Sequence, residues 1–157
     1  MEYQVEVKRV ESQTTAVVRR RVKQSELPTV VPQGCGEVWA FIRACGLHPF
    51  SHPGRNLALY LDGELNVEVG VEVTRPFTET ERVFCSSTPA GLVATTAHWG
   101  PYNRLGEAHA AVHKWCSDHG YALAGPSWEV YGHWEDDPAK LRTDVFWLLQ
   151  EAGESAG

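Results

Sequence analysis

The chain has 157 residues, of which 43% are hydrophobic, and its formal net charge at pH 7 is −6. A chain of this size can bury a core without disulfides or metal, so we expect a single domain over residues 1–157. The negative charge argues against a surface for double-stranded DNA, because such surfaces gather lysine and arginine against the phosphates. The chain has no run of about 18 apolar residues and no basic, then apolar start, so we expect neither a membrane span nor export.

The four cysteines do not form a C-x-x-C pair. They are Cys35, Cys45, Cys85 and Cys116. A free thiol inside a helix behaves as a small hydrophobic group, and reduced cysteines are typical of the cytoplasm. The sequence therefore predicts a cytoplasmic protein.

Alternation of apolar and polar residues predicts four strands in the first half of the chain, over residues 3–10, 14–22, 56–61 and 65–74. A helix is expected from about Val38 to Cys45, where apolar residues recur at helical spacing and Gly46 follows as a stop. The turn Asp62-Gly63 is a strong hairpin signal. Residues 25–34 and 75–89 are rich in turn formers and are predicted to be a connection and a linker.

The second half repeats this order of elements. Strands are predicted over residues 92–99, 127–134 and 142–149. A helix is expected after Asn103, a plausible N-cap, and Gly120 is expected to end it. Residues 151–157 are small and polar.

The two halves match each other in sequence as well. Residues 36–73 and 106–149 share a Gly-Glu pair at the helix and a tyrosine in the following strand, and both end in a Leu-x-x-acid-Val run. A self-match of this kind marks a duplicated unit. We therefore expect an α+β fold with repeats over about 3–74 and about 91–149. Each repeat would be a β-α-β-β unit; together they would form a mostly antiparallel sheet with two helices on one face and a cleft at the seam.

Aromatic residues around the strand at 127–134 point to a ligand site. Alternation places Glu129, Tyr131 and His133 on one face of that strand, and the next strand offers Trp147. A carboxylate among aromatic rings suits a flat or cationic organic molecule. The alternative is that Glu129 lies at the rim of the sheet while the aromatic residues fill the core, and the residues alone leave both open.

Other motifs in the chain give weaker signals. His109 and His113 have the spacing of a helical metal pair, but no H-E-x-x-H motif and no third ligand accompany them, so no metal is expected. Cys116 falls on the apolar stripe of its predicted helix and is interpreted as core rather than nucleophile. The chain contains no Gly-rich phosphate loop and no G-x-S-x-G motif. We expect no cofactor.

Several motifs, in order and with compatible gaps, resemble the GyrI-like small-molecule-binding domains, which also serve as effector-binding domains of MerR- and AraC-type regulators. In the second half they are AHWGPYNRLGEAH at 97–109, Trp115, GPSWEVY at 125–131, Asp137-Pro138 and LRTDV at 141–145. In the first half they are Pro49, Tyr60 and NVEVGV at 66–71. The resemblance covers nearly the whole chain. It implies a duplicated β-α-β-β fold with a cleft lined by aromatic residues and a carboxylate.

The resemblance also suggests roles for individual residues. Glu129 would be the pocket acid and Tyr131 its neighbour, with Tyr60 at the equivalent position of the first repeat. The candidate walls of the pocket are Trp39, Trp99 and Trp147. The last strand departs from the family pattern, because it reads VFWLL where many relatives continue to a proline. With no DNA-binding domain ahead of it, the chain would be a stand-alone member.

Three functions remain open from the sequence. The first is the binding of amphipathic, aromatic or cationic small molecules, for sensing or sequestration. The second, which the resemblance implies for some stand-alone members, is hydrolysis of cyclopropanoid DNA-alkylating natural products. There Glu129 would activate a water, and Tyr131 or Tyr60 would hydrogen-bond the carbonyl that gains charge. The third is a protein-interaction role of the gyrase-inhibitor type. The expected partner is a small molecule, with no direct contact to nucleic acid or membrane.

Overall fold

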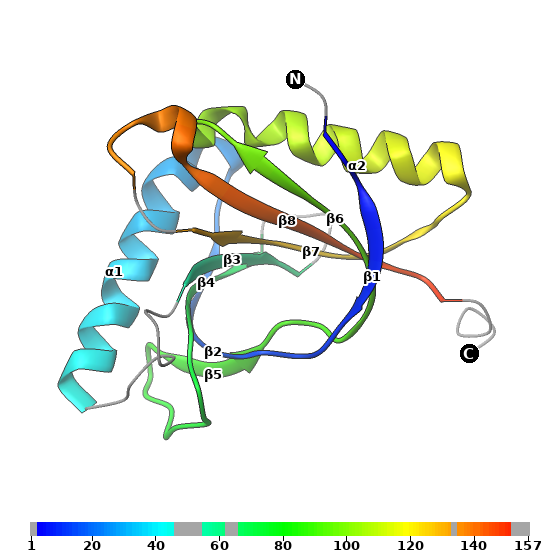
Figure 1. The fold of residues 1–157 in the computed structure, drawn as a ribbon. Coiled ribbons are helices and arrows are strands. Elements are labelled where there is room, and N and C mark those ends of the chain that lie inside the picture. Colours follow the sequence, from blue (N-terminus) through cyan, green and yellow to red (C-terminus); the bar gives the residue numbers. More distant parts are fainter. Residues whose placement is uncertain (1–2, 46–54, 62–65, 133–134, 152–157) are drawn as a thin grey trace. The chain divides into compact units, whose positions relative to one another are not determined.

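The computed structural model describes residues 3–45, 55–61, 66–132 and 135–151 (Figure 1). The chain forms two compact units. Residues Ser12–Pro89 make up the N-terminal unit, and Met1–Glu11 with Ala90–Gly157 make up the C-terminal unit. Each unit has an antiparallel sheet of four strands and one long helix. The predicted α+β class is confirmed, whereas the cleft at the seam and the single domain stay predictions.

The C-terminal unit has the strand order β1-β6-β8-β7. Its strands are β1 (Glu6–Val10), β6 (Gly91–Trp99), β7 (Leu123–Tyr131) and β8 (Arg142–Leu149). The helix α2 (Leu105–His119) lies along one face of this sheet (Figure 1). It buries Leu105, Ala108, Val112 and Cys116 against Ala94, Val145 and Leu149.

The N-terminal unit has the strand order β3-β4-β2-β5. Its strands are β2 (Thr14–Arg21), β3 (Asn56–Tyr60), β4 (Asn66–Glu72) and β5 (Phe84–Ser87). The helix α1 (Leu27–Cys45) packs on a core of valines from β2 and β4. Cys35 belongs to this core and donates a hydrogen bond to the Gly70 carbonyl, and burial raises the pKa of its thiol to about 12. Cys35, Cys85 and Cys116 are free thiols.

The two units repeat one arrangement, which confirms the predicted duplication. In each, the strand before the helix pairs with the last strand of the repeat, which also pairs with the strand after the helix. Tyr60 lies opposite Val67 in one hairpin and Tyr131 opposite Thr143 in the other, as the sequence alignment requires. The buried helix positions also correspond at a constant offset; Cys35, Val38 and Ile42 match Leu105, Ala108 and Val112.

The edge strands show an exchange that the sequence did not reveal. The strand β5, which precedes the second repeat in the chain, pairs with β2 of the first repeat. The strand β1, which precedes the first repeat, pairs with β6 of the second. Interpreting residues 75–89 wholly as a linker was therefore wrong. With only four residues, β5 is too short to show clear alternation.

The first helix begins earlier than predicted, because residues 27–34 are helical rather than a connection. Pro28 is tolerated because the first turn of a helix leaves its N–H groups without acceptors. Leu27 and Val31 continue the apolar face and pack against the core. Pro32 lies inside the helix, where it costs a backbone hydrogen bond, so this apolar packing outweighs the proline signal.

The second helix ends as predicted and begins differently. Gly120 adopts a left-handed conformation with φ of 78° and ends α2. Asn103 is not an N-cap; it lies in a short 3₁₀ turn that precedes Leu105. The predicted features at Gly46, Pro49 and Asp62-Gly63 lie outside the described residues. Neither described helix is long and apolar enough to cross a membrane.

Candidate functional site

The face of the C-terminal sheet beneath α2 carries three of the predicted site residues. Glu129 and Tyr131 alternate along β7, and Trp147 of β8 lies opposite Ser127, so all three side chains share that face. Tyr131 and Trp147 pack against the core that α2 covers. The structure thus brings Glu129, Tyr131 and Trp147 together on one surface.

Glu129 is buried, with 5% of its surface exposed, and each of its oxygens is hydrogen-bonded. The Tyr131 hydroxyl donates to Oε1 over 2.6 Å. Nε2 of His109, on α2, lies 2.6 Å from Oε2. Both contacts are short, as expected for hydrogen bonds to a charged acceptor. These bonds explain how a carboxylate is tolerated on a buried face.

The protonation of His109 follows from its second contact. Nε1 of Trp147 donates to Nδ1 of His109 over 2.9 Å. An indole N–H can only donate, so Nδ1 must be an unprotonated acceptor. The proton of a neutral imidazole then lies on Nε2, directed at Glu129. The result is a chain of donors that runs from Trp147 through His109 to Glu129.

A phenol and an imidazole both donate to Glu129. Hydrogen bonds from neutral donors stabilise a carboxylate without cancelling its charge. A negative charge among aromatic rings suits a cation, through Coulomb attraction and cation–π contact.

Aromatic side chains surround this carboxylate. Trp147 lies edge-on to two histidines of α2, with ring centroids 5.8 Å apart for His109 and 4.2 Å apart for His113. Tyr102 meets the Tyr131 ring edge-on at 5.6 Å. Burial lowers the pKa of His113, because it disfavours the charged form of the ring.

His109 and His113 therefore hold the Trp147 ring, which accounts for their spacing. Among the residues that the structure describes, no group of three or more potential metal ligands occurs. His109 itself was missed as a site residue. A usable signal was its position in the repeat, because it aligns with Trp39, one of the predicted walls.

Trp99 is not brought to this surface. It pairs with Arg142 across β6 and β8, whereas Glu129 pairs with Val145, so the two side chains lie on opposite faces of the sheet. Trp99 is 48% exposed, and the Arg142 guanidinium carbon lies 5.4 Å from its ring centroid.

Trp39 and Tyr60 belong to the N-terminal unit. Nε1 of Trp39 donates to Oδ1 of Asn56 over 2.7 Å, and Tyr60 packs against the α1 core. The β3–β4 and β7–β8 registers make Ala58 the counterpart of Glu129, so the first repeat keeps the tyrosine and lacks the acid.

Two more polar groups lie beneath α2. His98 is 1% exposed; Tyr3 lies 2.9 Å from its Nδ1, and the Pro101 carbonyl lies 3.0 Å from its Nε2. A carbonyl can only accept, so Nε2 of His98 carries a proton. Thr143 lies between His98 and Tyr131 in the sheet, and its hydroxyl is buried without a hydrogen-bond partner.

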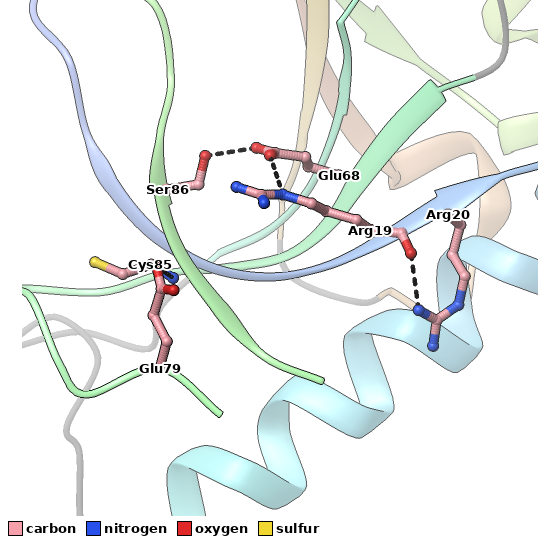
Figure 2. Close-up of polar contacts among 6 residues, drawn as sticks. All are labelled: Arg19, Arg20, Glu68, Glu79, Cys85 and Ser86. Carbon is pink, nitrogen blue, oxygen red and sulfur yellow. Dashed lines mark hydrogen bonds and ion pairs between the residues drawn. The ribbon is translucent and has the colours of Figure 1, made fainter. Parts of the chain in front are cut away.

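A second buried carboxylate, Glu68 of the N-terminal unit, has a different environment (Figure 2). Nε of Arg19 donates to one of its oxygens over 2.9 Å, and the Ser86 hydroxyl donates to the other over 2.6 Å. The Arg19 guanidinium also lies 4.4 Å from the Phe84 ring centroid. Glu68 is therefore directly paired with a cation, and we interpret this cluster as a structural link between β2, β4 and β5.

Comparison with known proteins places this architecture in a family. The family model for the GyrI-like small molecule binding domain matches residues 3–150. The C-terminal domain of EcmrR is similar in structure, with a TM-score of 0.81 and 25% identity over 97% of this chain and 100% of that one.

Two further solved structures are similar at lower identity, and these show the fold alone. SAV2435 bound to tetraphenylphosphonium has a TM-score of 0.68 and 13% identity over 96% of this chain and 94% of that one. A hydrolase from Listeria innocua has a TM-score of 0.58 and 11% identity over 94% and 92%. No curated protein matches the chain significantly. With the family model spanning both repeats, the chain belongs to the GyrI-like small molecule binding domains.

Proposed function

We propose that the C-terminal unit binds aromatic cations at Glu129. The observation that carries the proposal is a buried carboxylate that lies among aromatic side chains and is hydrogen-bonded to His109 and Tyr131. Trp147 and Tyr131 supply flat rings beside it, which a lipophilic cation can contact while its charge meets the carboxylate. Because Glu129 is only 5% exposed, the cation reaches it when the covering side chains move aside.

The family supports this assignment. Its description is small-molecule binding, and SAV2435, which shares the fold, is bound to a lipophilic aromatic cation in its structure. The role we propose is sensing or sequestration of such compounds in the cytoplasm, without direct contact to nucleic acid. The free thiols of the described cysteines suit a reducing compartment.

The test compares two probes of the same shape and opposite charge, tetraphenylphosphonium and tetraphenylborate. Calorimetric titration of the native protein should show binding of the cation and much weaker binding of the anion. Glu129→Gln should weaken cation binding by about 1–3 kcal/mol, the scale of a lost charged partner, which is roughly 5- to 150-fold.

The matched control is Glu107→Gln, which also changes a carboxylate to an amide but at the exposed first turn of α2. It should bind the cation like the native protein. Equal affinity of Glu129→Gln and native protein, with the circular dichroism spectrum unchanged, would show that the site lies elsewhere.

Hydrolysis is a second candidate because a carboxylate and a phenol lie 2.6 Å apart on one face. Glu129 could take a proton from water while the Tyr131 hydroxyl stabilises an oxygen that gains charge, as in opening a cyclopropane conjugated to a carbonyl. In that case Glu129→Gln should lower turnover by roughly 10²- to 10⁴-fold while substrate still binds. Mass spectrometry of a cyclopropanoid substrate incubated with the protein separates this outcome from binding alone.

A further inference from the structure

The hydroxyl of Thr143 has no use within the folded chain. Thr143 is fully buried, and among the residues that the structure describes no group lies within hydrogen-bond distance of its Oγ1. A buried hydroxyl without a partner costs free energy, so folded proteins keep few of them. We propose that this hydroxyl binds the ligand, and that the site therefore favours aromatic cations with a hydroxyl, ether or carbonyl oxygen on a short arm. This inference rests on the proposed function of the site.

The strand register puts Thr143 on the same face of the sheet as the candidate site. Along β8 it alternates with Val145 and Trp147, which both pack beneath α2. Its partner across β7 is Tyr131, whereas Glu129 is the partner of Val145. Thr143 and Glu129 are therefore diagonal neighbours, and residues related in this way lie about 7–8 Å apart. A cation held at the carboxylate brings a short polar arm within reach of Oγ1.

The two side chains beside Thr143 in the sheet form hydrogen bonds to other groups. The Tyr131 hydroxyl has one proton, which it donates to the site carboxylate. His98, the partner of Thr143 on β6, lies 2.9 Å from the Tyr3 hydroxyl through Nδ1 and 3.0 Å from the Pro101 carbonyl through Nε2. A ligand atom can supply the partner that these neighbours do not.

A ligand reaches Thr143 only if the side chains above it move, because the residue is fully buried. Tyr102, on the short turn before α2, meets the Tyr131 ring edge-on and is 38% exposed. Its ring can turn into solvent, which would uncover the end of the face where Tyr131 and Thr143 are paired. The same movement would expose the hydroxyl and the carboxylate together.

Two other threonines provide matched controls. The Thr15 hydroxyl is also buried without a partner among the described residues, but Thr15 lies on β2, which carries no residue of the candidate site. The Thr96 hydroxyl has a partner, because it donates to the Gln4 carbonyl over 2.8 Å. Valine has nearly the same shape as threonine, so Thr→Val at each position removes the hydroxyl and little else.

The stability of the free protein gives the first test. Thr143→Val and Thr15→Val should each raise Tm by at least about 2 °C, because a buried hydroxyl without a partner is replaced by a methyl group. Thr96→Val should lower Tm, because it leaves the Gln4 carbonyl without its donor. A Tm of Thr143→Val below that of the native protein would show that the hydroxyl has a partner before any ligand binds, and would overturn the inference.

The second test is calorimetric titration with pairs of probes that differ in one group. Hydroxypropyl-triphenylphosphonium and butyl-triphenylphosphonium differ by a hydroxyl in place of a methyl group, and the hydroxyethyl and propyl compounds form a shorter pair. For at least one pair, Thr143→Val should change the ratio of the two affinities by about 2- to 10-fold against the hydroxyl probe, the scale of one neutral hydrogen bond. Thr15→Val should leave both ratios as they are in the native protein.

The outcomes separate this inference from the function on which it rests. If both ratios stay unchanged in Thr143→Val while Glu129→Gln still weakens tetraphenylphosphonium binding, the role of Thr143 is refuted and the function stands. A ratio that changes equally in Thr143→Val and Thr15→Val would also refute the role of Thr143. Tetraphenylphosphonium binding that ignores Glu129→Gln would refute the proposed function and this inference with it.

Discussion

The Tyr131 hydroxyl helps to keep a charged group inside the C-terminal unit. Tyr131→Phe keeps the ring and its edge-on contact with Tyr102, but it removes one donor from the buried Glu129 carboxylate. Losing a hydrogen bond to a buried charged group costs about 1–3 kcal/mol, so the free energy of unfolding should fall by that amount. Urea denaturation followed by tryptophan fluorescence measures it.

The control for this change is Tyr121→Phe, at an exposed tyrosine whose ring stacks on Trp115. It should change the free energy of unfolding by less than about 0.5 kcal/mol, as is usual for surface substitutions. Equal stability of Tyr131→Phe and native protein would mean that the hydroxyl does not stabilise the carboxylate.

The site residues differ in how far the sequence could locate them. Glu129, Tyr131 and Trp147 could be grouped because strand alternation and hairpin pairing fix which side chains share a face. His109 could not be assigned to them from its own helix, because its contact with β7 depends on how α2 packs. Trp99 was added on resemblance, and its pairing with Arg142 turns it to the other face.

At Gly34 the helix α1 packs closely against its sheet. A Cβ there would lie 2.9 Å from Cγ2 of Val18 and 3.0 Å from Cγ1 of Val69. Gly34→Ala should therefore destabilise the protein by about 1–3 kcal/mol through overpacking. Thermal or urea denaturation checks this.

Gly36 provides an internal comparison two residues further along the same helix. A Cβ there would have no atom within 4 Å, and the position is exposed. Gly36→Ala should stabilise the protein by about 0.5–1 kcal/mol, because alanine favours a helix over glycine. If both substitutions changed stability in the same direction, close packing at Gly34 would not be the reason for its glycine.

The errors at the level of elements have a shared physical cause, which is tertiary packing. Pro28 and Pro32 suggested a connection, yet Leu27 and Val31 gain enough from burial in the α1 core to extend the helix through them. The strand β5 forms because β2 offers a free edge, and its four residues carry little pattern of their own. By contrast, β8 was predicted with the bounds that the structure shows.

In the molecule as a whole, the two repeats have the same arrangement of strands and helix but carry different polar side chains. The second repeat carries Glu129 and His109, where the first has Ala58 and Trp39. In the first repeat the buried carboxylate of Glu68 forms an ion pair with Arg19. The site that we propose therefore lies in the second repeat, and this difference between the repeats could be inferred only once the strand registers were known.

The structure of the protein with tetraphenylphosphonium bound tests the central claim most directly. We predict that the phosphonium lies next to the Glu129 carboxylate, with its phenyl rings against Tyr131 and Trp147. A cation bound on the opposite face of the sheet near Trp99, with the hydrogen bonds of Glu129 unchanged, would contradict it.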